Sequence, residues 1–204
     1  MPLKKPQSPA ASAPASAEPD VAELLAGLTN PDAGRRRSAA RGLAQHPQAA
    51  NALGNAVAAE AQESVREAIF TALIRIGTND AAAGLLPLLE SEDPGLRNGA
   101  IEALKTMPDA VAKHIDEIFS GPVDVRIFGV EILAALAHPQ SAQWLLRIIA
   151  EDRELNVCAG AVDALAECGD ASAVAPLRRL LERFPNEPFL EFSVNDAIAR
   201  IMNG

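Results

Sequence analysis

Side chains that could carry catalysis or bind a metal are few in this sequence, and they are scattered. The histidines His46, His114 and His138 are isolated from one another and fall at expected helix ends or turns. Cys158 and Cys168 lie on one expected helix, roughly 15 Å apart, which is too far for a disulfide. Their spacing does not match a zinc motif either. The sequence therefore predicts no catalytic residue, no metal site and no bound cofactor.

Sequence motifs for phosphate binding and acyl transfer are also lacking. No glycine-rich loop opens a helix, and no nucleophile elbow occurs. Acidic residues are numerous, but they recur at helical spacing, which is typical of a solvated helix face. Cys158 could be a reactive thiol, although a packed, inert cysteine is the more ordinary interpretation.

Four arginines recur at an interval of roughly 30 residues: Arg36, Arg66, Arg97 and Arg126. A row of guanidinium groups could bind an anion. The helical wheel instead places each arginine near the buried edge of a helix, where its stem packs and its head meets a carboxylate. The column continues at Cys158 and Glu191, where the arginine is replaced. Acidic residues stand four positions before four members of the column: Asp32, Asp93, Glu154 and Glu187. We therefore interpret the arginines as a structural row.

The arginines belong to a longer repeat that is clearest between Asp93 and Met107. Asp93 can cap a helix, Pro94 suits its first turn, and apolar residues follow on one face up to the anchor Leu104. Equivalent anchors recur along the chain at Leu43, Leu73, Leu133, Leu165 and Ile198. One such helix cannot bury its apolar face alone, so the spacing predicts stacked repeats.

The segments Asp93–Arg97, Glu63–Arg66 and Asp124–Arg126, each followed by an Ala-Leu-type ending, resemble HEAT repeats. The similarity is greatest to the short bacterial form that is also found in phycobilisome bilin lyases. It implies an all-α protein, a right-handed α-solenoid of about six helical pairs with the second helix of each pair on the concave side. Residues 20–204 would form this domain, and residues 1–19, rich in Pro, Ala and Ser, would be a disordered tail.

Composition and charge narrow the possible functions. Apolar residues make up 49% of the chain but aromatic residues only 3%, which suits closely packed Ala/Leu helices better than a β-sandwich. The net charge of −9 argues against a nucleic-acid partner. No run of about 18 apolar residues is present, so no membrane span is expected. The sequence predicts a cytoplasmic protein, of bacterial type.

Positions opposite the buried face of the second helices are candidates for binding. Two residues before the anchors stand Arg41, Thr71, Glu102, Glu131, Asp163 and Asp196. Six residues before them stand Arg37, Glu67, Asn98, Ile127, Ala159 and Phe192. Five before, the bulky residue is Phe128, and nine before, the column ends in Phe189. The predicted partner-binding residues on the concave face are Glu102, Asp124, Ile127, Phe128, Glu131, Asp163, Phe192 and Asp196.

Each aromatic candidate has a second interpretation. Ile127 and Phe128 could fold against a neighbouring helix, and Phe189 and Phe192 could seal the C-terminal end of the stack. If they are exposed instead, a basic amphipathic protein segment would complement the apolar patch and the acidic row. The leading hypothesis is therefore a non-enzymatic interaction scaffold.

The resemblance supplies alternatives to a scaffold. One is a lyase-like enzyme, enzyme subunit or chaperone acting on a tetrapyrrole-bearing protein, as in HEAT-like bilin lyases, although no aromatic-lined cleft bearing a histidine is evident. HEAT-like DNA glycosylases use a basic groove, which the acidic row opposes. HEAT-repeat iron hydroxylases need His-Glu pairs, and none occurs in this sequence.

Overall fold

The computed structural model describes residues 20–203, and within this range every regular element is helical. The predicted tail, residues 1–19, lies outside the described residues. The second helices of the six pairs are α2 (Ala33–Leu43), α4 (Glu63–Ile76), α6 (Pro94–Lys105), α9 (Val123–Ala135), α11 (Leu155–Cys168) and α13 (Pro188–Asn203). The all-α solenoid predicted from the sequence is confirmed.

The first halves of the pairs are less regular. Three are α-helices, wholly or after a 3-10 turn: α1 (Val21–Gly27), η1 and α3 (Pro47–Ala49 and Ala50–Ala59), and α10 (Ser141–Glu151). The others are α5 with η2 (Asn79–Leu85 and Leu86–Glu90), α7 with α8 (Pro108–Val111 and Ile115–Ser120), and η3 with α12 (Ala171–Ala173 and Val174–Arg183). In the fourth repeat the place of a single first helix is thus taken by two short ones.

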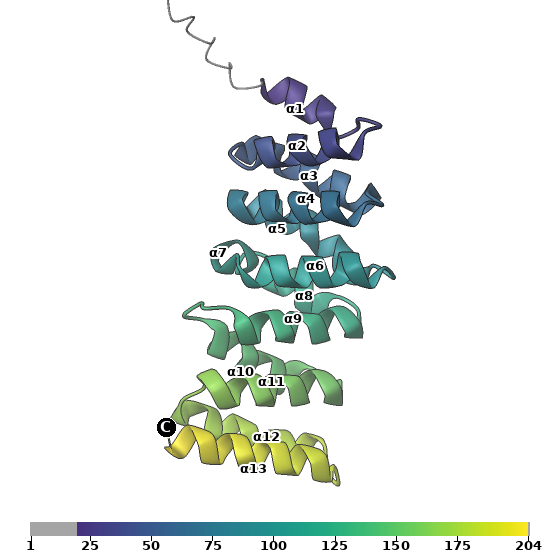
Figure 1. Ribbon diagram of the computed structural model, residues 1–204. Coiled ribbons are helices and arrows are strands. Elements are labelled where there is room, and N and C mark those ends of the chain that lie inside the picture. Colours follow the sequence, from purple (N-terminus) through teal and green to yellow (C-terminus); the bar gives the residue numbers. More distant parts are fainter. Residues whose placement is uncertain (1–19, 204) are drawn as a thin grey trace, which may run out of the picture.

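The pairs stack in chain order (Figure 1), so that each contacts mainly its neighbours. The second helices form one layer, lying nearly parallel to one another from α2 to α13. In this view first helices such as α3, α5 and α8 lie behind the layer, and α1 lies above α2. Helix α4 packs between α2 and α6, and α11 packs between α9 and α13. This arrangement leaves one long side of the second helices uncovered.

Local sequence signals set the helix boundaries. The Asp93 side chain accepts hydrogen bonds from the backbone N–H groups of Gly95 (2.8 Å) and Leu96 (3.4 Å), and Pro94 occupies the first turn of α6. Asp32 caps α2 in the same way. Helix α4 ends at Gly77, whose φ of 59° falls in the left-handed region that glycine adopts without a Cβ clash.

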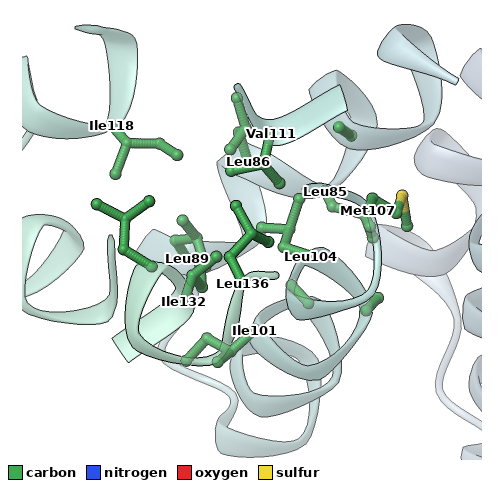
Figure 2. Close-up of a cluster of buried hydrophobic side chains, with 14 of the residues drawn as sticks. Leu85, Leu86, Leu89, Ile101, Leu104, Met107, Val111, Ile118, Ile132 and Leu136 are labelled. Atoms are coloured by element: carbon green, nitrogen blue, oxygen red, sulfur yellow. The ribbon is translucent and has the colours of Figure 1, made fainter. Parts of the chain in front are cut away.

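The core runs the length of the stack, and the anchors lie at its centre. Leu43, Leu73, Leu104 and Leu165 have no exposed surface, and Leu133 is 1% exposed. Figure 2 shows Leu104 of α6 beside Leu85 and Leu86 of the preceding helix segment and near Leu136, which directly follows α9. Each anchor thus fills a space made by more than one repeat, which is why the fold needs stacking.

Small residues allow the first helices to approach closely. A Cβ added to Gly54 of α3 would lie 3.0 Å from the Cα of Gly84 of α5, so these backbones cross with almost no side chain between them. Glycine costs helix propensity at both places, and the close contact between the two helices compensates for it.

The arginine row forms the seam between repeats, as the sequence predicted. The arginines donate to carbonyl oxygens at the end of the preceding helix: Arg36 to Asn30, Arg66 to Glu60, Arg97 to Ser91 and Arg126 to Gly121. Three also reach forward to a carboxylate of the next repeat, as Arg36 to Glu60, Arg66 to Asp93 and Arg126 to Asp152, at 2.7–2.8 Å. Of the acids expected as partners, Asp93 alone forms such an ion pair within the described residues.

The third and fifth repeats differ from this pattern. The fourth repeat has Ser120 and Pro122 at the places where other repeats have Glu60, Asp93 or Asp152. Arg97 therefore meets no carboxylate there and lies over the ring of Phe128, 5.6 Å from its centroid. In the fifth repeat Cys158 replaces the arginine, and its Sγ donates to the carbonyl oxygen of Asp152 at 3.5 Å. Arg183 of α12 donates to the carbonyl oxygens of Ile149 and Asp152, so a guanidinium still reaches this seam.

We predict that Arg126→Ala lowers the free energy of unfolding by about 1.5–3 kcal/mol, because it strands the carboxylate of Asp152, whose side chain is only 8% exposed. Arg97→Ala should cost less, since no carboxylate loses its partner. Arg147→Ala is the control, because its pair with Asp116 is exposed and worth at most about 1 kcal/mol. Urea unfolding followed by circular dichroism measures the order, and equal losses in all three variants would contradict this account.

A pH dependence follows from Glu60. Its hydrogen bond from Arg36 holds the pKa of the carboxyl below its ordinary value of 4.5. A carboxyl whose folded-state pKa is lowered stabilises the fold above its unfolded-state pKa, and the stability is lost as the pH falls through the folded-state value. We expect the urea midpoint of the wild type to fall more steeply below about pH 4.5 than that of Glu60→Gln. Parallel curves would contradict this expectation.

Candidate interaction surface

The uncovered side of the second helices is the candidate interaction surface, which we call the second-helix face. It consists of the positions two, six and nine residues before each anchor. All six residues at the position two before the anchor are exposed: Arg41, Thr71, Glu102, Glu131, Asp163 and Asp196. The residues nine before are also exposed, including Asp124 of α9 and Phe189 of α13. The fold therefore does not dictate what stands there.

Phe189 and Phe192 are the most exposed large apolar side chains of the described residues, at 69% and 71%. They occupy the positions nine and six before the anchor. In the interior repeats these positions stay exposed or half-buried although a further repeat follows, as at Asp124 and Asn98. The position nine before the anchor is thus exposed in every described repeat, whereas the position six before is half-buried at Ile127 and Ala159. Binding and end-sealing both stay predictions for the two phenylalanines.

The position five before the anchor belongs to the seam, which corrects the sequence prediction that it points outward. Ala68 and Ser193 are buried there, and a Cβ on Gly160 would lie 3.3 Å from Val130. Phe128 is the one large side chain in this column. It is half-buried and stacks against Arg97.

Ile127 is also half-buried and packs against the core. Of the two interpretations of Ile127 and Phe128, the structure therefore supports the one in which both side chains fold against the stack. Their part in binding a partner stays a prediction.

The acidic row differs in character along its length. Lys105 bridges Glu102 and Glu131 at 2.7 and 2.8 Å, and these two hydrogen bonds raise the pKa of its ammonium group. Asp163 has no such partner in the described residues. Its pKa is raised by partial desolvation and by the neighbouring Asp196 carboxylate, while Arg200 acts in the opposite direction. Two carboxylates, Asp163 and Asp196, thus face each other on α11 and α13 beside Phe192, and Arg200, which pairs with Glu167, offsets part of their charge.

Positive charge lies at the other end of the face. Arg37 and Arg41 follow each other by one turn on α2, and neither guanidinium forms a hydrogen bond or ion pair within residues 20–203. Neither arginine is among the partner-binding residues predicted from the sequence.

The scattered reactive side chains stay apart in space. Burial raises the pKa of the Cys158 thiol to about 11, so it is protonated and inert at neutral pH. His138 stacks on Trp144, and His114 lies 2.9 Å from Glu117. In the part of the chain that the structure describes, no three His, Cys, Asp or Glu side chains gather to hold a metal ion. Within the same residues, no helix has the length and apolar composition needed to cross a membrane.

Phe128 is half-buried and Phe192 is exposed, so the same substitution at the two residues should have different effects on stability. Phe128→Ser should lower the melting temperature by roughly 2–8 °C, because it removes a half-buried ring and its contact with Arg97, about 1–2 kcal/mol in a chain of this size. Phe192→Ser should leave the melting temperature within about 1 °C, because its ring is exposed. Calorimetry of both variants decides, and a larger loss in Phe192→Ser would contradict the assignment of the two sites.

Comparison with known proteins places this geometry in a family. The family model of HEAT repeats matches residues 21–105 and 111–188. A bilin biosynthesis protein of Mastigocladus laminosus, PecE, is 45% identical over 155 residues, which are 74% of this chain and 57% of that protein. The matched part of the chain thus spans little more than half the length of this curated relative.

Two solved structures match the chain at lower sequence identity. The complex of CpcE and CpcF of the phycocyanin lyase of a Nostoc species is 18% identical, with 98% of each chain covered and a TM-score of 0.39. A HEAT-like repeat protein of the archaeon Thermococcus onnurineus is 16% identical, with 90% of this chain and 87% of that chain covered and a TM-score of 0.44.

The relative named for bilin biosynthesis corrects the leading functional hypothesis. A non-enzymatic interaction scaffold was expected because no catalytic cluster could be found in the sequence. The 45% identity to that protein contradicts this hypothesis and favours the lyase-like alternative. The lack of a cluster of catalytic residues does not exclude such a role, since a protein can take part in an enzymatic reaction by binding and positioning the reactants. Because the model of HEAT repeats matches most of its length, the chain belongs to the HEAT-repeat family.

Proposed function

We propose that this chain is a lyase-like enzyme, or a subunit or chaperone of one, that acts on a tetrapyrrole-bearing protein. The observation that carries the proposal is the 45% identity over 155 residues to a bilin biosynthesis protein. Because the matched region is 57% of that protein, the activity of the whole relative is extended to this chain as part of the proposal.

The geometry supports a role in binding and orientation. A linear tetrapyrrole carries its own conjugated system, so the protein must hold it, shield it and align it with an acceptor side chain. The second-helix face offers a long preformed surface whose residues the fold leaves free. Its charged and aromatic groups are therefore available for recognition.

The partner in this proposal is a protein that meets the second-helix face. At the α11–α13 end the face presents Asp163 and Asp196, neither of which forms an ion pair within the described residues, next to the exposed rings of Phe189 and Phe192. A segment with apolar anchors and Lys or Arg would complement this end. Ile127 and Ala159 continue the row of Phe192 along α9 and α11 and would extend the contact.

The test uses the purified chain, a linear tetrapyrrole and a phycobiliprotein with and without its chromophore. We expect binding to the tetrapyrrole or to the phycobiliprotein at micromolar concentrations. We also expect a change in the rate at which tetrapyrrole is attached to the acceptor or released from it, read by absorbance and by fluorescence of the denatured protein. Binding to neither molecule would contradict the proposal.

The contribution of the face is tested by charge reversal. Asp163→Lys with Asp196→Lys should weaken binding of the phycobiliprotein at least about tenfold, more so at low salt, because exposed charges are screened at high salt. Asp109→Lys with Glu182→Lys is the matched control, since both residues are exposed and lie on α7 and α12, away from the face. Equal losses in both pairs would indicate a general charge effect and contradict the assigned surface.

A further inference from the structure

The second-helix face has a positive end and a negative end. On α2, Arg41 is exposed and Arg37 half-buried, and neither forms an ion pair within the described residues. On α11 and α13, Asp163 and Asp196 lie close enough for each to act on the other, with Arg200 offsetting part of their charge. Between these ends, Lys105 joins Glu102 to Glu131 and reduces the charge of the middle. A surface that meets this face must therefore reverse its charge along the stack.

A second copy of the chain has this property when it is turned end for end. A two-fold axis that lies in the contact plane and runs parallel to the helices reverses the order of the repeats but keeps the position along each helix. Helix α2 of one copy then faces α13 of the other, α4 faces α11, and α6 faces α9. Both ends of the contact are formed at once, because the symmetry repeats each pairing.

The residues that meet in this arrangement are complementary. Arg41 and Asp196 both stand two residues before an anchor, so opposite charges face each other. Arg37 and Phe192 both stand six before, so a guanidinium faces an exposed ring. The chain already uses that kind of contact internally, between Arg97 and Phe128 at 5.6 Å. Asp163 faces Thr71 of α4, one turn from the exposed Glu67. Glu102 and Glu131 face like charge, and in each copy Lys105 holds both of them.

We propose that two copies of this chain associate reversibly through their second-helix faces, with the α2 end of each copy on the α11–α13 end of the other. The inference rests on the partner surface of the proposed function, but not on any contact with a tetrapyrrole. It identifies one basic surface that the acidic end accepts. A protein partner that binds the same end would compete with the second copy.

The experiment is sedimentation velocity of the full 204-residue chain at low and high salt. We expect a dimer whose population rises with concentration and falls with salt. Arg37→Glu with Arg41→Glu should weaken self-association at least about tenfold, and so should Asp163→Arg with Asp196→Arg, because each pair sets like charges against each other twice. Asp109→Arg with Glu182→Arg should have no effect.

Two combinations make the test specific to this geometry. An equal mixture of the two weakened variants should form a heterodimer, because each reversed end then faces an opposite charge. A single chain carrying all four reversals should dimerise again. Circular dichroism checks that each variant is folded.

A wild-type chain that stays monomeric at about 100 μM would overturn the dimer. Failure of the mixture and of the fourfold variant to associate would overturn the arrangement. If the monomeric chain still binds the phycobiliprotein, the proposed function stands and the basic surface belongs to that partner. If the dimer forms but nothing else binds, the proposed function fails and this inference stands.

Discussion

Each second helix has one apolar face that only the neighbouring repeats can bury, and the structure follows from this constraint. The anchors from Leu43 to Leu165 are fully covered because helices on both sides contribute to the space around them. Ile198 of α13 is half-buried, since no described repeat follows it. Burial of a leucine side chain contributes roughly 1.5–3 kcal/mol, so the stability of the chain is spread along the stack. The opposite side of these helices is consequently free of packing requirements.

The fold must also supply hydrogen-bond donors at the seam between repeats. The carbonyl oxygens at the end of each first helix have no partner within their own helix and must be satisfied in another way. An arginine serves in four repeats, and where Cys158 replaces it, Arg183 reaches the same place from the next repeat. Where Arg97 lacks a carboxylate, the ring of Phe128 takes over one side of the guanidinium. The same physical requirement is therefore met by different residue types.

Because packing does not fix the residue types on the second-helix face, this face can carry residues for binding. Glu102 and Glu131 are linked by Lys105, whereas Asp163, Asp196, Phe189 and Phe192 have no comparable partner within the described residues. Exposed aromatic side chains that gather on one surface are typical of interaction sites. A role in presenting a tetrapyrrole or its carrier protein needs such a surface and does not require a catalytic cluster on this chain.

The sequence by itself determined the repeat, the helical pairs and the identity of the buried anchors, because helical periodicity records which side of each helix is apolar. It also determined the structural nature of the arginine row, since a fixed place at the edge of that apolar face must adjoin the next repeat. It did not predict the two short helices α7 and α8, whose turn at Ala112–His114 has no strong breaker after Pro108.

Only the tertiary structure decided between seam and surface for residues one helical position apart. Phe128 lies five residues before its anchor and Phe192 six, yet one contacts the neighbouring repeat and the other is 71% exposed. A helical wheel measures direction around one helix, and it cannot say how far the next helix reaches around it. That distance depends on the packing of whole repeats, which is why the exposed face could be assigned only after the stack was known.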